Sequence, residues 1–375
     1  SSIGYFLVLV SMLFVVLGFV LFWKEKWIFP LIFLLPFFLL RALGDSFLRI
    51  KHKYHYIQIF GTVGMIIYLI FLIFLSKINE LGITLSFALS HIIVALIFFC
   101  ILHKEFSSLF SKVHINFNTV KTYLKTAVFI TFISMSFSFL GWMDNLILGL
   151  LSDYLAVANY AISNSLAGIV GVISGSLSMF LLTRSAEINN KKKAKKVLKR
   201  MIRISYSLTL VAAIILISFL TVILKYFFPK YLGVEFFVLV LLLGMLFFSV
   251  YHSIVIYYTG KLSPEKIFYP LIVAAIINIS LDILLIPLYG VYGIVFATLI
   301  AHLFAMGLLI KKSENEVYFF PSLVLSGFVV WAYFLGILGL LLIVPAVIGL
   351  VITGMITQED RNVVWKVIKT IFNRN

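Results

Sequence analysis

Two apolar blocks joined by a short charged turn decide the fold of this chain: 204-ISYSLTLVAAIILISFLTVILKYF-227 and 235-EFFVLVLLLGMLFFSVYHSIVIY-257. Across 204–257 the charged residues are Lys225, Lys230 and Glu235. Each block has the ~20 residues that an α-helix needs to cross the hydrocarbon core of a bilayer. The stretch therefore predicts two membrane-spanning helices joined by a turn at the membrane surface.

The composition extends this pattern to the whole chain. Hydrophobic residues make up 63% of the 375 residues and charged residues 12%, more apolar surface than a water-soluble fold can hide. A membrane β-barrel would show short alternating segments, which this sequence lacks. The class predicted is an all-α polytopic membrane protein. The net charge of +16 comes from residues between the apolar blocks, so no nucleic-acid partner is expected.

The apolar blocks predict twelve membrane helices, and the basic residues orient them. Of the 30 Lys and Arg residues, 24 lie in one alternating set of loops and the tail, and five lie in the other set. Basic loops stay in the cytoplasm, so both ends of this chain are expected to be cytoplasmic, in a multi-pass protein of the cell membrane. The expected helices are 4–22, 28–44, 57–76, 82–102, 126–150, 154–182, 204–227, 235–257, 267–288, 291–310, 319–335 and 337–356.

An internal repeat relates two parts of the chain at an offset of about 211 residues. Gly82 opens one expected helix that carries His91, and Gly293 opens another that carries His302. The neighbouring helices keep the same offset, although the even spacing of any helical bundle would also give such a match. A parallel repeat of this kind predicts two lobes with a substrate site between them. It also leaves two helices without counterparts, so we expect two helices of the first lobe to precede this sequence.

Two stretches resemble a known family of transporters. The first is GWMDNLILGL at 141–150 followed by AVANYA at 156–161, and the second is NISLD at 278–282 followed by IPLYGVYGI at 286–294 and Ala297-Thr298. They resemble the seventh helix and the eleventh-to-twelfth helix junction of polysaccharide flippases in the multidrug/oligosaccharidyl-lipid/polysaccharide exporter superfamily. Asp282 stands where the family pattern leads us to expect Asn.

The resemblance implies a fold of fourteen helices, in two six-helix lobes plus a terminal pair. Residues 1–110 then correspond to the remainder of the N-terminal lobe, and the first two helices of the family are lacking. Residues 111–312 correspond to the C-terminal lobe, and 313–375 to the extra helix pair with a cytoplasmic tail.

Acidic residues at membrane depth are the first candidates for a substrate or ion pathway, because charge in the bilayer is costly. Asp144, beside Asn145, either faces a cavity or touches interfacial water. Asn278 and Asp282 share one helix face, either in the pathway or as a polar packing contact. Such acids suit proton or cation coupling, because ligand entry can change their charge state.

Two further residues are candidates. Arg41 lies four residues before Asp45, which favours a local ion pair, and Arg41 could also contact a phosphate. Asn164 begins a stripe of small residues that either packs against a neighbouring helix or lines the transport cavity. The basic run from 191 to 203 is interpreted as a solvated cytoplasmic loop, with binding of anionic headgroups as an added possibility.

The predicted function is that of a flippase or exporter. It would move a polyprenyl-diphosphate-linked oligosaccharide across the cytoplasmic membrane by alternating access for polysaccharide biosynthesis. The alternative is a drug/cation antiporter of the same superfamily, and a membrane-embedded glycosyl- or acyltransferase is a third possibility. No P-loop, zinc-protease or paired-cysteine pattern occurs, so no catalytic residue, cofactor or metal site is expected. The expected partners are the lipid-linked substrate, membrane lipids and a coupling cation or proton, and the chain is expected to be a monomer.

Overall fold

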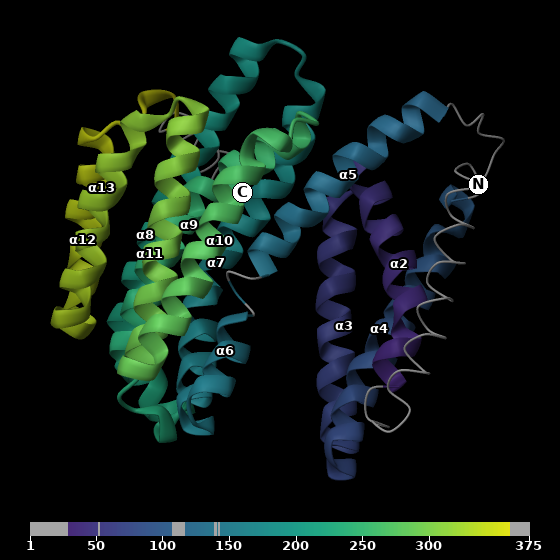
Figure 1. Ribbon diagram of the computed structural model, residues 1–375, viewed down its shortest axis with the longest axis horizontal. Coiled ribbons are helices and arrows are strands. Elements are labelled where there is room, and N and C mark those ends of the chain that lie inside the picture. The colour runs from purple at the N-terminus through teal and green to yellow at the C-terminus, as the bar shows by residue number, and fades with distance from the viewer. Residues whose placement is uncertain (1–28, 52, 107–116, 139–140, 142, 361–375) are drawn as a thin grey trace, which may run out of the picture. The chain divides into compact units, whose positions relative to one another are not determined.

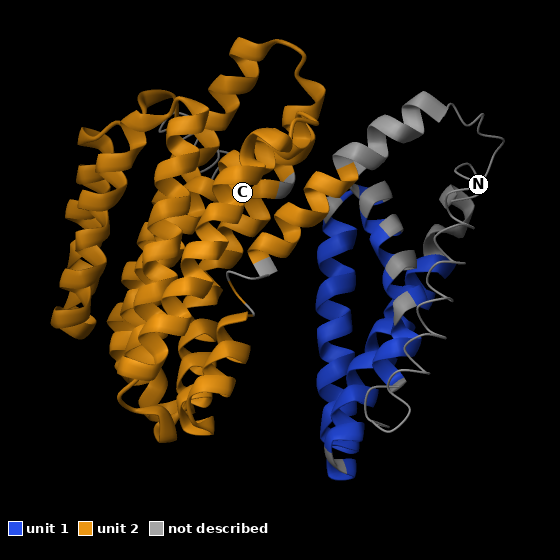
Figure 2. Ribbon diagram, in the orientation of Figure 1, with its two compact units in different colours: residues 1–119 blue, residues 120–375 orange. Residues whose placement is uncertain are grey.

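The computed structural model describes residues 29–51, 53–106, 117–138, 141 and 143–360. These residues form twelve α-helices and short 3₁₀ segments, and no β-strand occurs among them. The chain divides into two compact units, residues 1–119 and 120–375, which Figure 2 shows in blue and orange. The expected first helix, 4–22, lies outside the described residues.

Among the described residues, the first unit contains three long helices (Figure 1). Its small core contains Leu48, Phe60, Val94 and Phe98, which are 0–4% exposed. The exposed side chains of the second of these helices, Tyr54–Leu75, are apolar over several turns, as in a helix that faces lipid. The elements are α2 (Phe29–Ile50), α3 (Tyr54–Leu75), η2 (Ser76–Ile78) and α4 (Asn79–Phe106).

The second unit is a bundle whose central helix, α9, contacts α7, α8 and α11. Helix α9 is buried on nearly every side, which explains why its sequence is apolar all round. Helices α12 and α13 pack against α8 at the edge of the bundle (Figure 1). The elements are α5 (Phe117–Ser138), α6 (Asp144–Leu151), α7 (Tyr154–Glu187), α8 (Lys191–Phe227), η5 (Pro229–Tyr231), α9 (Glu235–Gly260), α10 (Glu265–Tyr289), α11 (Val291–Ser313), η6 (Glu316–Tyr318), α12 (Phe319–Leu335), η7 (Gly336–Leu342) and α13 (Ile343–Ile352).

The structure confirms the predicted class. Within the described residues, eight helices are long and apolar enough to cross a membrane. Large apolar side chains remain exposed along them, including Ile73 and Phe74 at 70% each. Lipid covers such surface in a membrane protein, whereas water-soluble monomers rarely expose apolar patches of this size. The chain is therefore a multi-pass α-helical membrane protein.

The structure corrects three helix boundaries. The expected helix 126–150 ends as α5 at Ser138 and resumes as the short α6 at Asp144. The expected last helix, 337–356, begins as the 3₁₀ segment η7 and is α-helical over Ile343–Ile352. Gly336 has a φ of 55°, which an L side chain rarely adopts, so the chain turns sharply there.

The third correction concerns the basic run that the sequence places in a loop. It forms the first turns of α8, because Asn190 caps the helix by accepting a 3.1 Å hydrogen bond from the Lys193 amide. Ala194, Leu198 and Ile202 recur every four residues and are at most 2% exposed. This apolar face makes the run an amphipathic helix despite its charge.

Gly82 and Gly293 occupy similar local positions in the two units. A Cβ atom on Gly82 would collide with the backbone of Leu75 at the end of α3, and one on Gly293 would collide with the backbone of Leu285 near the end of α10. Each glycine therefore allows one helix to begin tightly against the end of the preceding helix. The full 211-residue repeat stays a prediction.

Candidate functional site

Asp144 is the first residue of α6 and is fully buried in the second unit. Its Oδ2 accepts hydrogen bonds from the Tyr160 hydroxyl of α7 and, at 2.9 Å, from Thr298 Oγ1 of α11. Three separate helices thus hold one intramembrane carboxylate.

Asp282 of α10 joins Asp144 in a buried cluster, and Asn278 lies one turn before Asp282 on the same helix. Both are 0% exposed on the inner face of α10, and the Asp282 carboxyl group interacts with that of Asp144. Among the described residues, no hydrogen-bond partner reaches either carboxylate oxygen of Asp282 or either polar side-chain atom of Asn278. The structure therefore brings Asp282 beside Asp144, two acids that the sequence analysis considered separately.

Thr298 has a choice of hydrogen-bond acceptors. Its hydroxyl lies 2.9 Å from Asp144 Oδ2 and also 2.9 Å from the carbonyl oxygen of Ile294. A hydroxyl carries one proton, so it can donate to one of these two acceptors at a time.

The cluster adjoins a cavity of about 730 Å³ within the second unit. Thr298 belongs to both, and Asn145 and Asn164 lie on the cavity wall. Part of the small-residue stripe of α7 lines the same space. The remaining lining residues are Phe137, Gly141, Val157, Ala161, Ser165, Gly168, Gly171, Met245, Phe248, Tyr251 and His302.

His302 lines the cavity and forms a hydrogen-bonded pair with Tyr251. Its Nδ1 lies 2.8 Å from the Tyr251 hydroxyl, and both side chains are at most 5% exposed. Gly244 leaves room for the ring, since a Cβ atom there would lie 3.0 Å from His302 Cδ2. The pair supplies the cavity with polar groups that change little in position, because packing holds both rings.

The cluster places two carboxyl groups beside each other in the buried interior. Two adjacent carboxylates in a low-dielectric interior repel each other strongly and require a neutralising charge. Among the described residues, neither the cluster nor the cavity wall contains a Lys or Arg. The oxygen donors of Asp144, Asp282, Asn278 and Thr298 are of the kind that hard cations prefer.

Arg41 lies on α2 of the first unit. Its guanidinium is close to Gly61 and Gly64 of α3, about 4.0 Å from where a Cβ atom on either glycine would be. His91, four residues after Phe87, stacks on Phe38 with ring centroids 5.1 Å apart. The two glycines of α3 thus leave space for the Arg41 guanidinium.

Two cluster residues, Tyr160 and Thr298, were not among the candidates from sequence. Both lie inside the stretches that carry the family resemblance, one on the helix after Asp144 and one on the helix after Asp282. Their hydroxyl groups are uncharged, so a search for charged residues within the apolar helices could not find them. The signal that the sequence offered was a hydroxyl residue near the start of the helix that follows each of the two acidic residues.

Comparison with known proteins shows which fold this is. No protein-family model matches the sequence, and no curated protein matches it. Among solved structures, the lipid II flippase MurJ in its inward closed conformation superposes with a TM-score of 0.66 at 17% sequence identity. The match covers 91% of this chain and 82% of that one. The chain therefore has the fold of a MurJ-like membrane transporter.

Proposed function

We propose that the protein is a flippase that moves a polyprenyl-diphosphate-linked oligosaccharide across the cytoplasmic membrane for polysaccharide biosynthesis. The observation that carries this proposal is the MurJ-like fold over 91% of the chain, since MurJ is named for flipping a lipid-linked substrate. The resemblance of two sequence stretches to polysaccharide flippases supports an oligosaccharide as the polar part. Alternating access would then expose the cavity to each side of the membrane in turn.

The acidic cluster is the proposed coupling site. Binding of a cation or proton between Asp144 and Asp282 would neutralise their repulsion and draw α6 and α10 together. Thr298 links this event to the cavity, because the same side chain contacts Asp144 and lines the cavity wall. Occupation of the cluster can therefore bias the shape of the cavity, which is what coupling requires.

The diphosphate needs cationic contacts, and we propose Arg41 for that role. A guanidinium group binds phosphate oxygens in a bidentate manner. The cavity of the second unit has no Lys or Arg among its described lining residues and is partly walled by Phe137, Met245 and Phe248. That lining favours a second candidate function, a drug/cation antiporter, whose substrate would prefer an apolar cavity beside acids.

Transport by the purified protein in proteoliposomes tests the proposal. The substrates are a fluorescent polyprenyl-diphosphate oligosaccharide and, separately, a lipophilic organic cation, each measured with Na⁺, K⁺ or proton gradients. Flipping of the lipid supports the first function, and efflux of the cation with no lipid flipping supports the second. If neither the lipid nor the organic cation is moved, both candidate functions are contradicted.

Asp144→Asn and Asp282→Asn test the coupling site, with Asp153→Asn as a matched control. Asp153 caps α7 at an exposed position, and Asn is an equally good cap. Each cluster variant removes one charged ligand, worth about 1.5–3 kcal/mol, so cation affinity should fall roughly 10- to 150-fold. The control should keep wild-type ion dependence. Identical ion dependence in all four proteins would show that the cluster has no coupling role.

A further inference from the structure

A second cavity, of about 510 Å³, lies at the end of the second unit where the basic residues gather. We name it the lysine pocket. Five lysines and one acid line it, and they come from the start of α8, the turn between α9 and α10, and the end of α11. The lining residues are Asn189, Lys191, Lys195, Leu198, Tyr257, Tyr258, Lys261, Ser263, Lys266, Lys312, Ser313 and Glu314.

We infer that the lysine pocket binds a phosphate-bearing anion, supplied either by an anionic lipid headgroup or by a soluble phosphate. This inference goes beyond transport, because the pocket is separate from the acidic cluster and its cavity. The positive-inside rule accounts for the number of basic residues at this end of the helices. It does not require lysines from three segments to converge on one concave surface, where like charges repel.

Helix geometry aims the lysines inward. Asn190 caps α8 at the pocket, and Lys191 and Lys195 are four residues apart on one side of that helix. On the facing turn, the ammonium group of Lys261 donates to the carbonyl oxygen of Ile188. This contact ties the α9–α10 turn to the end of α7.

The charge balance of the pocket is strongly positive. Glu314 is its single acid among the described lining residues, and it forms a 2.6 Å ion pair with Lys195. Among described residues, no acidic partner pairs with Lys191 or Lys312. A concave surface with one sign of charge concentrates the electric field and attracts counter-ions.

The lysines of the pocket stabilise the negative charge of the Glu314 carboxylate. Its hydrogen bond from Lys195, together with the charges of Lys195, Lys191 and Lys199, holds the pKa of this carboxyl below its usual range, although the group is exposed. The residue adopts a left-handed φ of 59° at the end of α11, which a non-glycine side chain seldom adopts. The carboxylate thus occupies part of the pocket as an internal anion, and a ligand phosphate would compete with it.

The chemistry of the lining favours phosphate. Lysine is a point-charge donor suited to phosphate oxygens, and the hydroxyl groups of Tyr258 and Ser263 can donate hydrogen bonds beside them. Lys266 lies 5.8 Å from the centre of the Tyr258 ring, a cation–π contact that positions its ammonium group. The pocket lies at the ends of membrane helices, where headgroup phosphates occur, and on the side predicted to be cytoplasmic, where anionic lipids are enriched.

The test compares two double variants with equal charge change. Lys191→Gln with Lys312→Gln removes two pocket lysines, whereas Lys192→Gln with Lys193→Gln removes two exposed lysines of α8 outside the pocket lining. Purified proteins in phosphatidylcholine nanodiscs receive either phosphatidylglycerol in the bilayer or inorganic diphosphate in solution. Binding is read by thermal stabilisation, with circular dichroism to show that each variant is folded.

The pocket variant should bind roughly 30-fold more weakly than wild type, at about 5-fold for each lysine removed, and the control should bind as wild type does. Stabilisation by phosphatidylglycerol alone identifies a headgroup site, and stabilisation by diphosphate identifies a soluble ligand. Glu314→Gln should strengthen binding several-fold, because it removes the competing carboxylate. Equal weakening in both double variants, weaker binding in Glu314→Gln, or no stabilisation by either probe would overturn the inference.

Discussion

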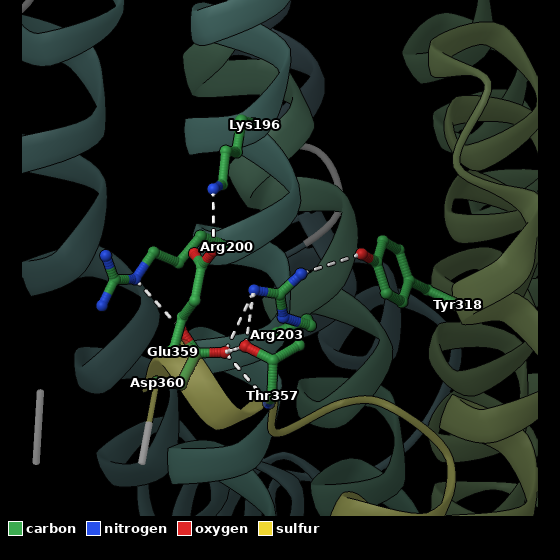
Figure 3. A network of polar contacts seen from close by, with 7 residues as sticks. All are labelled: Lys196, Arg200, Arg203, Tyr318, Thr357, Glu359 and Asp360. Atoms are coloured by element: carbon green, nitrogen blue, oxygen red, sulfur yellow. Dashed lines mark hydrogen bonds and ion pairs between the residues drawn. The ribbon is translucent and has the colours of Figure 1, made fainter. Parts of the chain in front are cut away.

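Asp360 fastens the segment after α13 onto α8, and replacing it with Asn tests that contact. Its carboxylate lies 3.0 Å from Arg203 and 3.0 Å from Arg200, and it also accepts hydrogen bonds from the backbone and hydroxyl of Thr357 at 3.1 and 2.6 Å (Figure 3). The Asp360 side chain is 8% exposed and that of Arg203 is 14% exposed. Asp360→Asn keeps the shape of the group and removes its charge.

The exposures set the expected magnitude. Removing one partner of a fully buried ion pair costs about 3–5 kcal/mol. The cost here is lower, because the Arg200 side chain is 36% exposed and Asn can keep the capping contact to Thr357. We expect the segment to lose about 2–3 kcal/mol of docking free energy. Glu359→Gln is the matched control. Its ion pair with Lys196 has side chains 63% and 72% exposed, so its loss should cost less than about 1 kcal/mol.

Hydrogen exchange of the backbone amides around 353–360 measures the docking. Asp360→Asn should raise the exchange of that segment by roughly 30- to 150-fold, which corresponds to 2–3 kcal/mol, and Glu359→Gln should leave it within a few-fold of wild type. Similar exchange in the two variants would show that the segment is held by its apolar contacts and not by Asp360.

The docking of this segment, measured by the same hydrogen-exchange assay, should depend on pH. Burial by itself raises the pKa of Asp360, but the hydrogen bonds from Thr357 and the charge of Arg203 outweigh it and hold the pKa below its usual range. A lowered folded pKa means that the stabilisation is complete above the ordinary carboxyl pKa and is lost as pH falls through the lowered value. Exchange in the wild type should therefore rise at acidic pH once the intrinsic rate is corrected for, and the Asp360→Asn profile should be flat.

Two further predictions concern helix packing and topology. Gly293→Ala should destabilise the folded protein by about 1–3 kcal/mol, because the new methyl group would collide with the backbone of the preceding helix. Gly327→Ala is the control and should be near neutral, since nothing lies within 4 Å of its Cβ position. Equal melting temperatures for the two variants would contradict the close packing at Gly293. In a chain whose single cysteine, Cys100, is replaced by Ser, a cysteine at Lys193 should react with impermeant reagents only from the cytoplasm and one at Asp153 only from outside, whereas labelling of position 193 from outside would reverse the predicted orientation.

Much of the fold was predictable because transfer into lipid depends on local composition. The blocks at 204–227 and 235–257 predicted α8 and α9, and the scarcity of acids at membrane depth singled out Asp144 and Asp282 before their neighbours were known. A charge in the bilayer is expensive wherever it lies, so its presence alone marks a position for attention. No knowledge of tertiary contacts is needed for that step.

Secondary structure was less predictable where two local signals opposed each other. The charge of 191–203 indicated a loop, yet the buried series of Ala194, Leu198 and Ile202 made it the start of α8. The expected helix 126–150 is described as two helices, α5 and α6. An apolar run could not separate the two, because hydrophobicity favours membrane residence of one helix and of two alike.

The meeting of distant residues was decided by tertiary structure alone. Asp144 and Asp282 are far apart in sequence, and only the packing of α6, α10 and α11 brings their carboxyl groups beside each other and beside Thr298. The lysine pocket likewise exists because three helix ends converge. Composition determines which side chains leave water, but the electrostatic field that a buried group experiences depends on neighbours chosen by helix packing, and that choice is a property of the whole bundle.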